Sequence, residues 1–349
     1  MKAVEHIIVL RFSAMGDVAM AVPVVKALLQ QHSQLHITFV SNAFFAPLFA
    51  GIERCHFLAA ATKGEHKGVT GLFKLFQSLR KGKSNYAVAD LHNVLRTTIL
   101  SSFFRFIAVP VASINKGRAA KKKLTARTGK VLHQLLTSHE RYAAVFARLG
   151  FKVDLLQLPP TTLQPLPTSL APKIGAGKIL VGVAPFAQHA TKMYPLEKMK
   201  VFLLQLQLAM PVQLLFFGAP GAEAAALQQW ETEMPGSTNV AGKLSFAEEL
   251  QLISHLKMMI SMDSANMHLA SIYAVPVLSI WGSTHPFAGF YGWNQSQENI
   301  VQASLYCRPC SVFGNKPCYR GDHACMHLVS TEMLMQKATT ILSGQATTL

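Results

Sequence analysis

Apolar residues in the first half of the chain gather in short runs that alternate with amphipathic stretches. The run HIIVLRF at His6–Phe12 is rich in β-branched residues and predicts a buried parallel strand. Similar patterns predict further strands at His36–Ser41, Ala87–Leu91 and Val109–Ile114, and helices that include His92–Phe106 and Gln134–Leu149. This alternation is typical of a doubly wound α/β domain.

A short turn follows the first predicted strand. Ala14-Met15-Gly16 makes the turn, and Asp17 can cap the helix that follows. Pro23 lies inside that helix and is expected to bend it or to shift its start.

The composition changes between Leu158 and Gly177, where Thr and Gly accompany five prolines: Pro159, Pro160, Pro165, Pro167 and Pro172. Proline removes backbone donors and fixes φ, so this stretch predicts a linker. We therefore expect two domains, residues 1–165 and residues 166–349.

The alternation of strand and helix patterns restarts after the linker. Strands are predicted at Ile179–Pro185, Val212–Gly218, Met258–Met262 and Val277–Trp281, and helices at Leu196–Leu208, Ala222–Glu233, Phe246–His255, Ala265–Tyr273 and Thr331–Leu342. The two halves read as similar α/β folds in tandem, without a repeat of sequence.

Composition limits the class of protein. Half of the residues are hydrophobic and 14% are charged, which excludes a disordered chain. Charged residues such as Arg11, Asp17 and Lys26 interrupt the richest N-terminal stretch, so no membrane-spanning run is expected there. The N-terminal stretch also lacks the pattern of a signal peptide, and we expect a cytoplasmic protein.

The formal net charge of +16 indicates an anionic partner: nucleic acid, an acidic membrane surface or a phosphorylated substrate. The sequence shows no zinc finger, no RNA-binding aromatic signature and no helix-turn-helix pattern. A basic nucleic-acid-binding protein is the alternative from another class because of the charge, and the missing motifs count against it. A nicotinamide dehydrogenase is disfavoured because the glycine fingerprint is absent.

Chemistry-bearing residues follow the strands of the second half. Small and polar residues open the helix after Met258–Met262, where free N–H groups suit a phosphate: Asp263, Ser264, Ala265, Asn266 and His268. Thr191 and Lys192 follow the first strand of this half, and Glu223, which follows the second, suits ribose hydroxyls. The plainer interpretations are a capping Asp263, a structural His268 and a solvated Lys192.

These motifs, with Gly16-Asp17 and the segment Asp90–Thr97, resemble glycosyltransferase family 9, the ADP-heptose:lipopolysaccharide heptosyltransferases. The cysteine-rich tail is more similar to the branch that adds the second heptose. The resemblance implies the GT-B architecture, two Rossmann-like domains facing across a cleft, with an acceptor-binding N-terminal domain and a nucleotide-sugar-binding C-terminal domain. Ala265 departs from the pattern, since many members have Gly there.

The resemblance also implies an inverting transfer that requires no metal, with Asp17 as catalytic base. Lys192 and the turn Asp263–His268 would contact the donor diphosphate, while Glu223 is assigned less firmly. The implied donor is ADP-heptose and the implied acceptor is the lipopolysaccharide inner core. Another nucleotide sugar or envelope acceptor on the same fold is the alternative.

The acceptor that the resemblance implies is an anionic glycolipid at the inner membrane, and basic residues are expected to bind it: Arg96, Arg118, Lys121, Lys122 and Lys123. The run from Lys116 to Lys130 is expected to lie in the first domain and to hold the protein peripherally at that surface. A flexible solvated loop is the alternative interpretation.

Four cysteines in the tail have a spacing that opens with C-x₂-C: Cys307, Cys310, Cys318 and Cys325. Four thiolates can close a tetrahedral structural zinc site. The later spacing fits no standard finger, so redox-active or packed free thiols remain alternatives.

Overall fold

The computed structural model describes residues 4–157, 161 and 163–344. The chain forms two compact units. In the described residues, the first unit contains 4–116 and 136–157, and the second contains 117–135, 161 and 163–344. The division near residue 160 lies within the predicted linker, five residues before the expected boundary. Pro159 and Pro160 lie outside the described residues.

A parallel five-stranded sheet forms the centre of the first unit, in the order β3-β2-β1-β4-β5. Its elements are β1 (His6–Leu10), α1 (Met15–Gln31), β2 (His36–Ser41), β3 (Cys55–Ala59), α2 (Gly68–Arg80), β4 (Tyr86–Asp90), α3 (Leu95–Phe106), β5 (Val111–Ser113) and α5 (Ser138–Arg148). The unit thus has the predicted α/β alternation, and it adds β3 and α2, which the sequence patterns did not single out.

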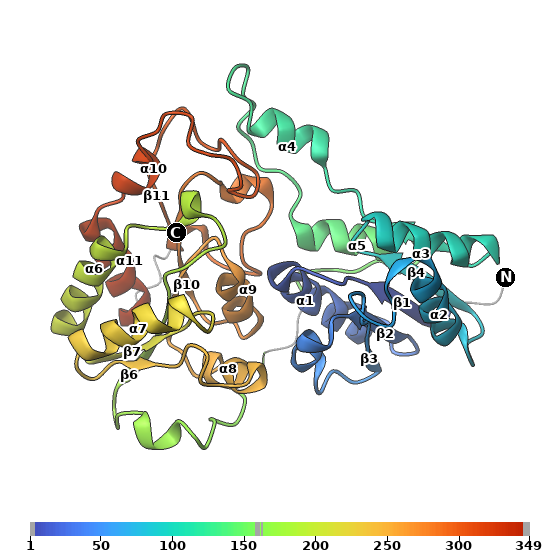
Figure 1. Ribbon diagram of the computed structural model, residues 1–349, viewed down its shortest axis with the longest axis horizontal. Helices are drawn as coiled ribbons and strands as arrows, with labels where there is room; N and C mark the ends of the chain where they lie inside the picture. Colours follow the sequence, from blue (N-terminus) through green and yellow to red (C-terminus); the bar gives the residue numbers. More distant parts are fainter. Residues whose placement is uncertain (1–3, 158–160, 162, 345–349) are drawn as a thin grey trace. The chain divides into compact units, whose positions relative to one another are not determined.

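Helices cover the first sheet because alternate strand residues point to opposite faces. Ile8 and Leu10 of β1 pack with Leu75 of α2 and Phe104 of α3, and α2 and α3 lie side by side (Figure 1). Helices α1 and α5 pack together. A capping box fixes the start of α5, where the Thr137 hydroxyl accepts the Glu140 N–H and the Glu140 carboxylate accepts the Thr137 N–H.

Helix α1 differs from its expected start. It begins at Met15 with Ala14 as N-cap, so Asp17 lies in its first turn and is not the capping residue. The helix continues past Pro23 without a break. The helix therefore starts further from Pro23 than expected, with no shift toward the proline, and the capping role of Asp17 is wrong.

The second unit contains a parallel six-stranded sheet in the order β11-β10-β9-β6-β7-β8. Its elements are α4 (Arg118–Leu124), β6 (Ile179–Ala184), α6 (Leu196–Ala209), β7 (Val212–Phe216), α7 (Ala222–Glu233), β8 (Thr238–Asn239), α8 (Phe246–Ile253), β9 (Met258–Met262), α9 (Ala265–Ile272), β10 (Val277–Trp281), β11 (Ile300–Gln302), α10 (Ala324–His327) and α11 (Thr331–Ser343). All four strands predicted for this half are present.

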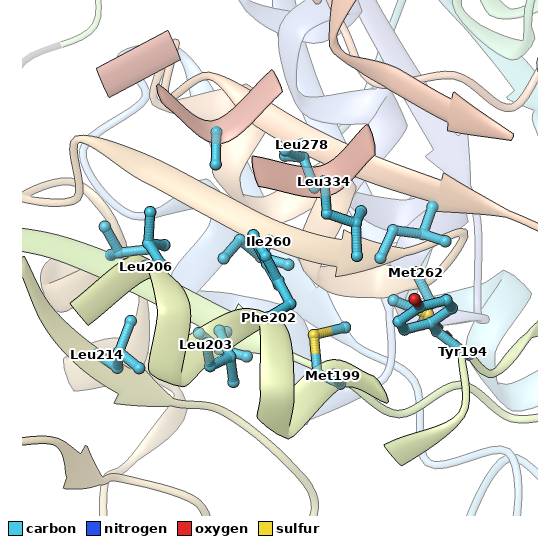
Figure 2. Close-up of a cluster of buried hydrophobic side chains, with 14 of the residues drawn as sticks. Tyr194, Met199, Phe202, Leu203, Leu206, Leu214, Ile260, Met262, Leu278 and Leu334 are labelled. Carbon is cyan, nitrogen blue, oxygen red and sulfur yellow. Dashed lines mark hydrogen bonds between the residues drawn. The ribbon is translucent and has the colours of Figure 1, made fainter. Parts of the chain in front are cut away.

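The main core of the second unit lies between its sheet and the helices α6, α7 and α11. Figure 2 shows Phe202 and Leu206 of α6 beside Ile260 of β9, with Leu334 of α11 in the same cluster. Burying one such side chain contributes about 1.5–3 kcal/mol. The sheet is therefore a rigid base for the loops that leave the carboxyl ends of its strands.

Each sheet has a point at which the order of its strands reverses. In the first sheet β1 lies between β2 and β4, and in the second β6 lies between β7 and β9. Open α/β sheets bind ligands outside the carboxyl ends of the strands at such a point. The loops after β1 and β4, and after β6 and β9, are therefore where binding groups are expected.

Membrane insertion through a helix finds no support in the part of the chain that the structure describes. None of its helices combines the length and the apolar character of a membrane span.

Candidate active site

An ion pair lies at the point where the strand order of the second sheet reverses. Lys192 ends a short 3₁₀ helix after β6, and Asp263 follows β9 directly. The Lys192 Nζ is 3.0 Å from the Asp263 Oδ2, and the side chains are only 14% and 8% exposed. The Thr284 hydroxyl after β10 donates to the same oxygen at 2.8 Å. Asp263 thus holds a largely buried ammonium in place at the expected binding edge.

Asp263 also leads into the start of α9. Ser264 is the N-cap in an extended conformation, but its hydroxyl makes no capping bond and shares a 3.1 Å hydrogen bond with Ser261. Ala265 and Asn266 are half-buried in the first turn. The N–H groups of a first helical turn lack intrahelical acceptors and attract anions. Lys192 and this helix start can therefore stabilise a diphosphate together.

Three other predicted donor residues are placed differently. The Thr191 hydroxyl donates to the Gly314 carbonyl at 2.5 Å and accepts from Ser283, so this buried group is engaged inside the protein. His268 is buried one turn into α9. Glu223 is half-buried, and its Oε2 accepts the N–H of Ala219 at 2.8 Å, which closes the loop after β7. The contacts of Thr191 with Gly314 and Ser283 therefore indicate that this residue holds the surrounding loops in position.

Asp17 lies at the corresponding edge of the first sheet, after β1. Its side chain is 32% exposed and forms an ion pair with Arg11, whose side chain is only 6% exposed. Arg11 donates to the Leu91 carbonyl at 2.7 Å, and the Tyr142 hydroxyl donates to the Asp17 carbonyl at 3.2 Å. These contacts hold a partly exposed carboxylate, a group that can accept a proton.

The loop after β4 supplies a second group at this edge. The Asp90 carboxylate accepts the N–H groups of His92 and Asn93 at 2.9 and 2.7 Å, which fixes the turn. Burial, with the nearby Arg11 and Lys116 charges, lowers the pKa of His92 to about 4. The His92 imidazole is therefore neutral at pH 7, and the charges near it include those of Arg11 and Asp17.

Sequence reasoning assigned no role to Arg11 or His92. A signal for Arg11 was present, since a charged residue directly follows the apolar run His6–Leu10 and must be paired if the strand end is buried. His92 lies in the segment Asp90–Thr97 that contributed to the resemblance, but no role was assigned to it.

The predicted acceptor-binding residues divide into exposed and buried groups. Arg96 is exposed in the first turn of α3, and Arg118, Lys122 and Lys123 are exposed on α4. Lys121 is 8% exposed, with its Nζ 3.9 Å from the centre of the Phe290 ring. An acceptor-binding role for Lys121 therefore conflicts with its place in the structure, because the ammonium is covered by an aromatic face.

The segment 117–135 belongs to the second unit, whereas the sequence placed it in the first. Leu124 and Leu135 pack with Ala288, and the N–H of Leu135 donates to the Phe287 carbonyl at 2.9 Å. The Lys130 Nζ donates to the carbonyls of Cys307 and Pro309 at 2.8 and 2.9 Å. These long-range contacts explain why position in the sequence assigned the segment to the wrong domain.

The four tail cysteines line one small cavity of about 20 Å³ and none forms a disulfide. Burial raises the pKa of Cys325 to about 11 and also raises that of Cys310, so these two groups are thiols at pH 7 as they lie. Across the described ranges, no group of three or more His, Cys, Asp or Glu residues is arranged to hold a metal ion. As they lie, the thiols do not fit a zinc site.

Comparison with known proteins decides the family. A model described as glycosyltransferase family 9 (heptosyltransferase) matches residues 72–317. The chain belongs to this family. The resemblance inferred from Asp17, Lys192 and the turn after β9 is thus confirmed at the level of the family, and so is the enzyme class.

Relatives agree with this assignment. The chain is 28% identical to lipooligosaccharide heptosyltransferase 2 of Campylobacter jejuni over 106 residues, 30% of this chain and 32% of that protein. The structure of Escherichia coli ADP-heptose lps heptosyltransferase II has a TM-score of 0.67 at 16% identity, covering 98% of this chain and 99% of that one. The iron-containing dodecameric glycosyltransferase TibC of enterotoxigenic E. coli has a TM-score of 0.59 at 14% identity, covering 99% and 78%. Both similarities support the GT-B fold.

Proposed function

We propose that this family 9 glycosyltransferase moves heptose from ADP-heptose onto the inner core of lipopolysaccharide, with inversion at the sugar carbon. The observation that carries the proposal is the Lys192–Asp263 pair at the start of α9, where the second sheet reverses its strand order. The similar E. coli protein is named an ADP-heptose lps heptosyltransferase II and the C. jejuni relative a lipooligosaccharide heptosyltransferase 2, and these names favour this donor and this class of acceptor.

On the donor side, the diphosphate of the nucleotide sugar leaves as the glycosidic bond breaks. Negative charge develops on its oxygens, and Lys192 with the N–H groups of Ala265 and Asn266 stabilises that charge. The Asp263 carboxylate fixes the direction of the Lys192 ammonium and takes no part in bond breaking. Glu223 contributes to holding the ribose only with its remaining oxygen, since Oε2 closes its own loop.

On the acceptor side, a sugar hydroxyl is a poor nucleophile. Asp17 accepts its proton while the new C–O bond forms and the bond to the diphosphate breaks, so charge and atoms balance in one displacement. A single displacement inverts the anomeric carbon and needs no second nucleophilic carboxylate. Arg11 holds the Asp17 carboxylate in place through their ion pair.

The reaction class is tested by incubating the protein with a panel of nucleotide sugars and a truncated core acceptor, with products read by mass spectrometry. We expect a heptosyl adduct of the acceptor with ADP-heptose and no adduct with the other nucleotide sugars of the panel. Transfer of another sugar, or to another envelope acceptor, would favour the alternative on the same fold.

We further propose a cytoplasmic protein, peripherally bound at the inner membrane through its exposed cations. Replacing Arg118, Lys122 and Lys123 by alanine should weaken binding to anionic vesicles on the order of a hundredfold at low salt, because each basic residue near the surface contributes roughly 1 kcal/mol. The loss should shrink as salt rises. Vesicle co-sedimentation measures it.

The matched control replaces three exposed lysines elsewhere in the second unit, Lys173, Lys178 and Lys257. It removes the same net charge, so equal losses in both triple variants would show a general charge effect and refute a site on α4. Lys121→Ala should instead lower the melting temperature, since it removes the contact with Phe290.

Catalysis without a metal is also proposed. Treatment with EDTA should leave kcat within about twofold of untreated enzyme, since the mechanism gives Lys192 and helix N–H groups the charge-stabilising role. A kcat lost on chelation and restored by a metal would contradict this proposal; the iron-containing relative TibC makes iron one of the metals to try.

The structural zinc predicted from Cys307, Cys310, Cys318 and Cys325 is decided separately, by elemental analysis of protein purified without chelator. One zinc per chain would confirm the site. Clearly substoichiometric zinc, with four thiols titrating under native conditions, would rule it out.

A further inference from the structure

Gly314 lies against the stem of the lysine proposed to hold the donor. It belongs to the cysteine-bearing segment 307–325 and has a φ of +80°, a conformation that side chains disfavour. A methyl group built on Gly314 would lie 2.4 and 2.5 Å from the Lys192 Cδ and Cγ. No real Cβ tolerates such distances, so the Lys192 side chain could not keep its present path beside any other residue.

Hydrogen bonds fix this close approach from both sides. The Thr191 hydroxyl donates to the Gly314 carbonyl, and the Ser311 hydroxyl accepts the Gly314 N–H at 2.9 Å. The Ser283 carbonyl accepts the N–H of Ser311 at 3.2 Å, while the Ser283 N–H donates to the Thr191 carbonyl at 3.2 Å. The cysteine-bearing segment and the loop after β6 are thereby tied together through Ser283, which follows β10.

We propose that Gly314 is a positioning residue for donor binding: its missing side chain leaves the passage through which Lys192 reaches Asp263. The aliphatic part of the Lys192 side chain passes beside Gly314, and the Lys192 Nζ lies 3.0 Å from the Asp263 Oδ2. The proposal rests on the proposed function, in which Lys192 holds the diphosphate. Under this proposal the cysteine-bearing segment supports donor binding, and this role requires no ligand in the cysteine cavity.

The test compares Gly314→Ala with Gly321→Ala. Gly321 lies in the same segment with a φ of +79°, and nothing lies within 4 Å of a methyl group built there. Both variants place a side chain at nearly the same positive φ, and only the first displaces Lys192. We expect Gly314→Ala to weaken ADP binding in calorimetry about ten- to a hundredfold, as for loss of a charged hydrogen bond. Gly321→Ala should bind as wild type.

A double-mutant cycle separates positioning from a general disturbance. In a Lys192→Ala background, Gly314→Ala should cause no further loss of ADP affinity, because the side chain it displaces is already gone. Equal affinities of the Gly314→Ala and Gly321→Ala proteins, or additive losses with Lys192→Ala, would overturn the proposal.

A crystal structure of Gly314→Ala gives a readout that needs no donor. The Lys192 Nζ should leave the Asp263 carboxylate, and an ion pair kept at about 3 Å beside the new methyl group would refute the positioning role. Failure of the wild-type protein to bind ADP would instead count against the proposed function, and the crystal structure would still test Gly314.

Discussion

Asp17→Asn is expected to lower turnover by about two to four orders of magnitude, the usual contribution of a general base. The amide still faces Arg11 and fills the same volume, but it cannot accept the proton of the attacking hydroxyl. Donor affinity should remain near wild type, since Asp17 belongs to the first unit and the Lys192–Asp263 pair to the second. Single-turnover rates and ADP calorimetry measure the two quantities.

The control for this variant is Asp322→Asn. Asp322 is also an aspartate paired with an arginine, Arg320, at 2.7 Å, but it is exposed and has no proposed role in transfer. It should leave turnover unchanged. Near-normal turnover of the Asp17→Asn protein would remove Asp17 from the role of base.

Lys192→Ala is expected to reduce both donor affinity and rate, each by about ten- to a hundredfold, because a phosphate contact acts in the ground state and in the transition state. It should also destabilise the fold by about 3–5 kcal/mol, since it leaves Asp263 as an unpaired charge with a side chain only 8% exposed. Calorimetry, turnover and urea unfolding measure the three effects.

Two controls separate binding from folding. Lys192→Ala combined with Asp263→Asn removes the unpaired charge, so stability should recover while donor affinity stays low. Lys200→Ala breaks another lysine ion pair of the second unit, with Glu233 at 2.5 Å, and should alter neither affinity nor turnover. Unchanged donor affinity in the Lys192→Ala protein would show that this lysine is structural.

Much of the fold was predictable because its signals are local. The run predicted at His6–Phe12 forms β1 over His6–Leu10, and the runs at His36–Ser41 and Met258–Met262 form β2 and β9 with the predicted bounds. The helices α2, α4 and α10 and the strands β3, β8 and β11 were not predicted. β8 and β11 span only two and three residues, too few for a period to show.

The candidate site was predictable in part for the same reason. Parallel strands place their carboxyl ends along one edge, so a turn read after a strand is already placed at that edge. Lys192 and Asp263, 71 positions apart in the sequence, were predicted for one binding edge, and the structure joins them in an ion pair. The local sequence pattern did not predict which hydrogen-bond or ion-pair partner each polar side chain has at that edge.

By itself, the sequence determined the two α/β folds, the turns at the strand ends and the resemblance to the family. Apolar periodicity, turn residues and helix starts act over a few positions, and they are legible one segment at a time. They assign residue types to an edge of a sheet without saying which atoms meet there.

Only the tertiary structure decided the pairing of Arg11 with Asp17, the burial of Lys121 against Phe290 and the close approach of Gly314 to Lys192. The last two contacts join residues more than 100 positions apart, and the first depends on how a strand end and a helix turn fold over each other. Such contacts are set by the packing of whole elements, which fixes the direction of a side chain only after the sheets and helices have assembled.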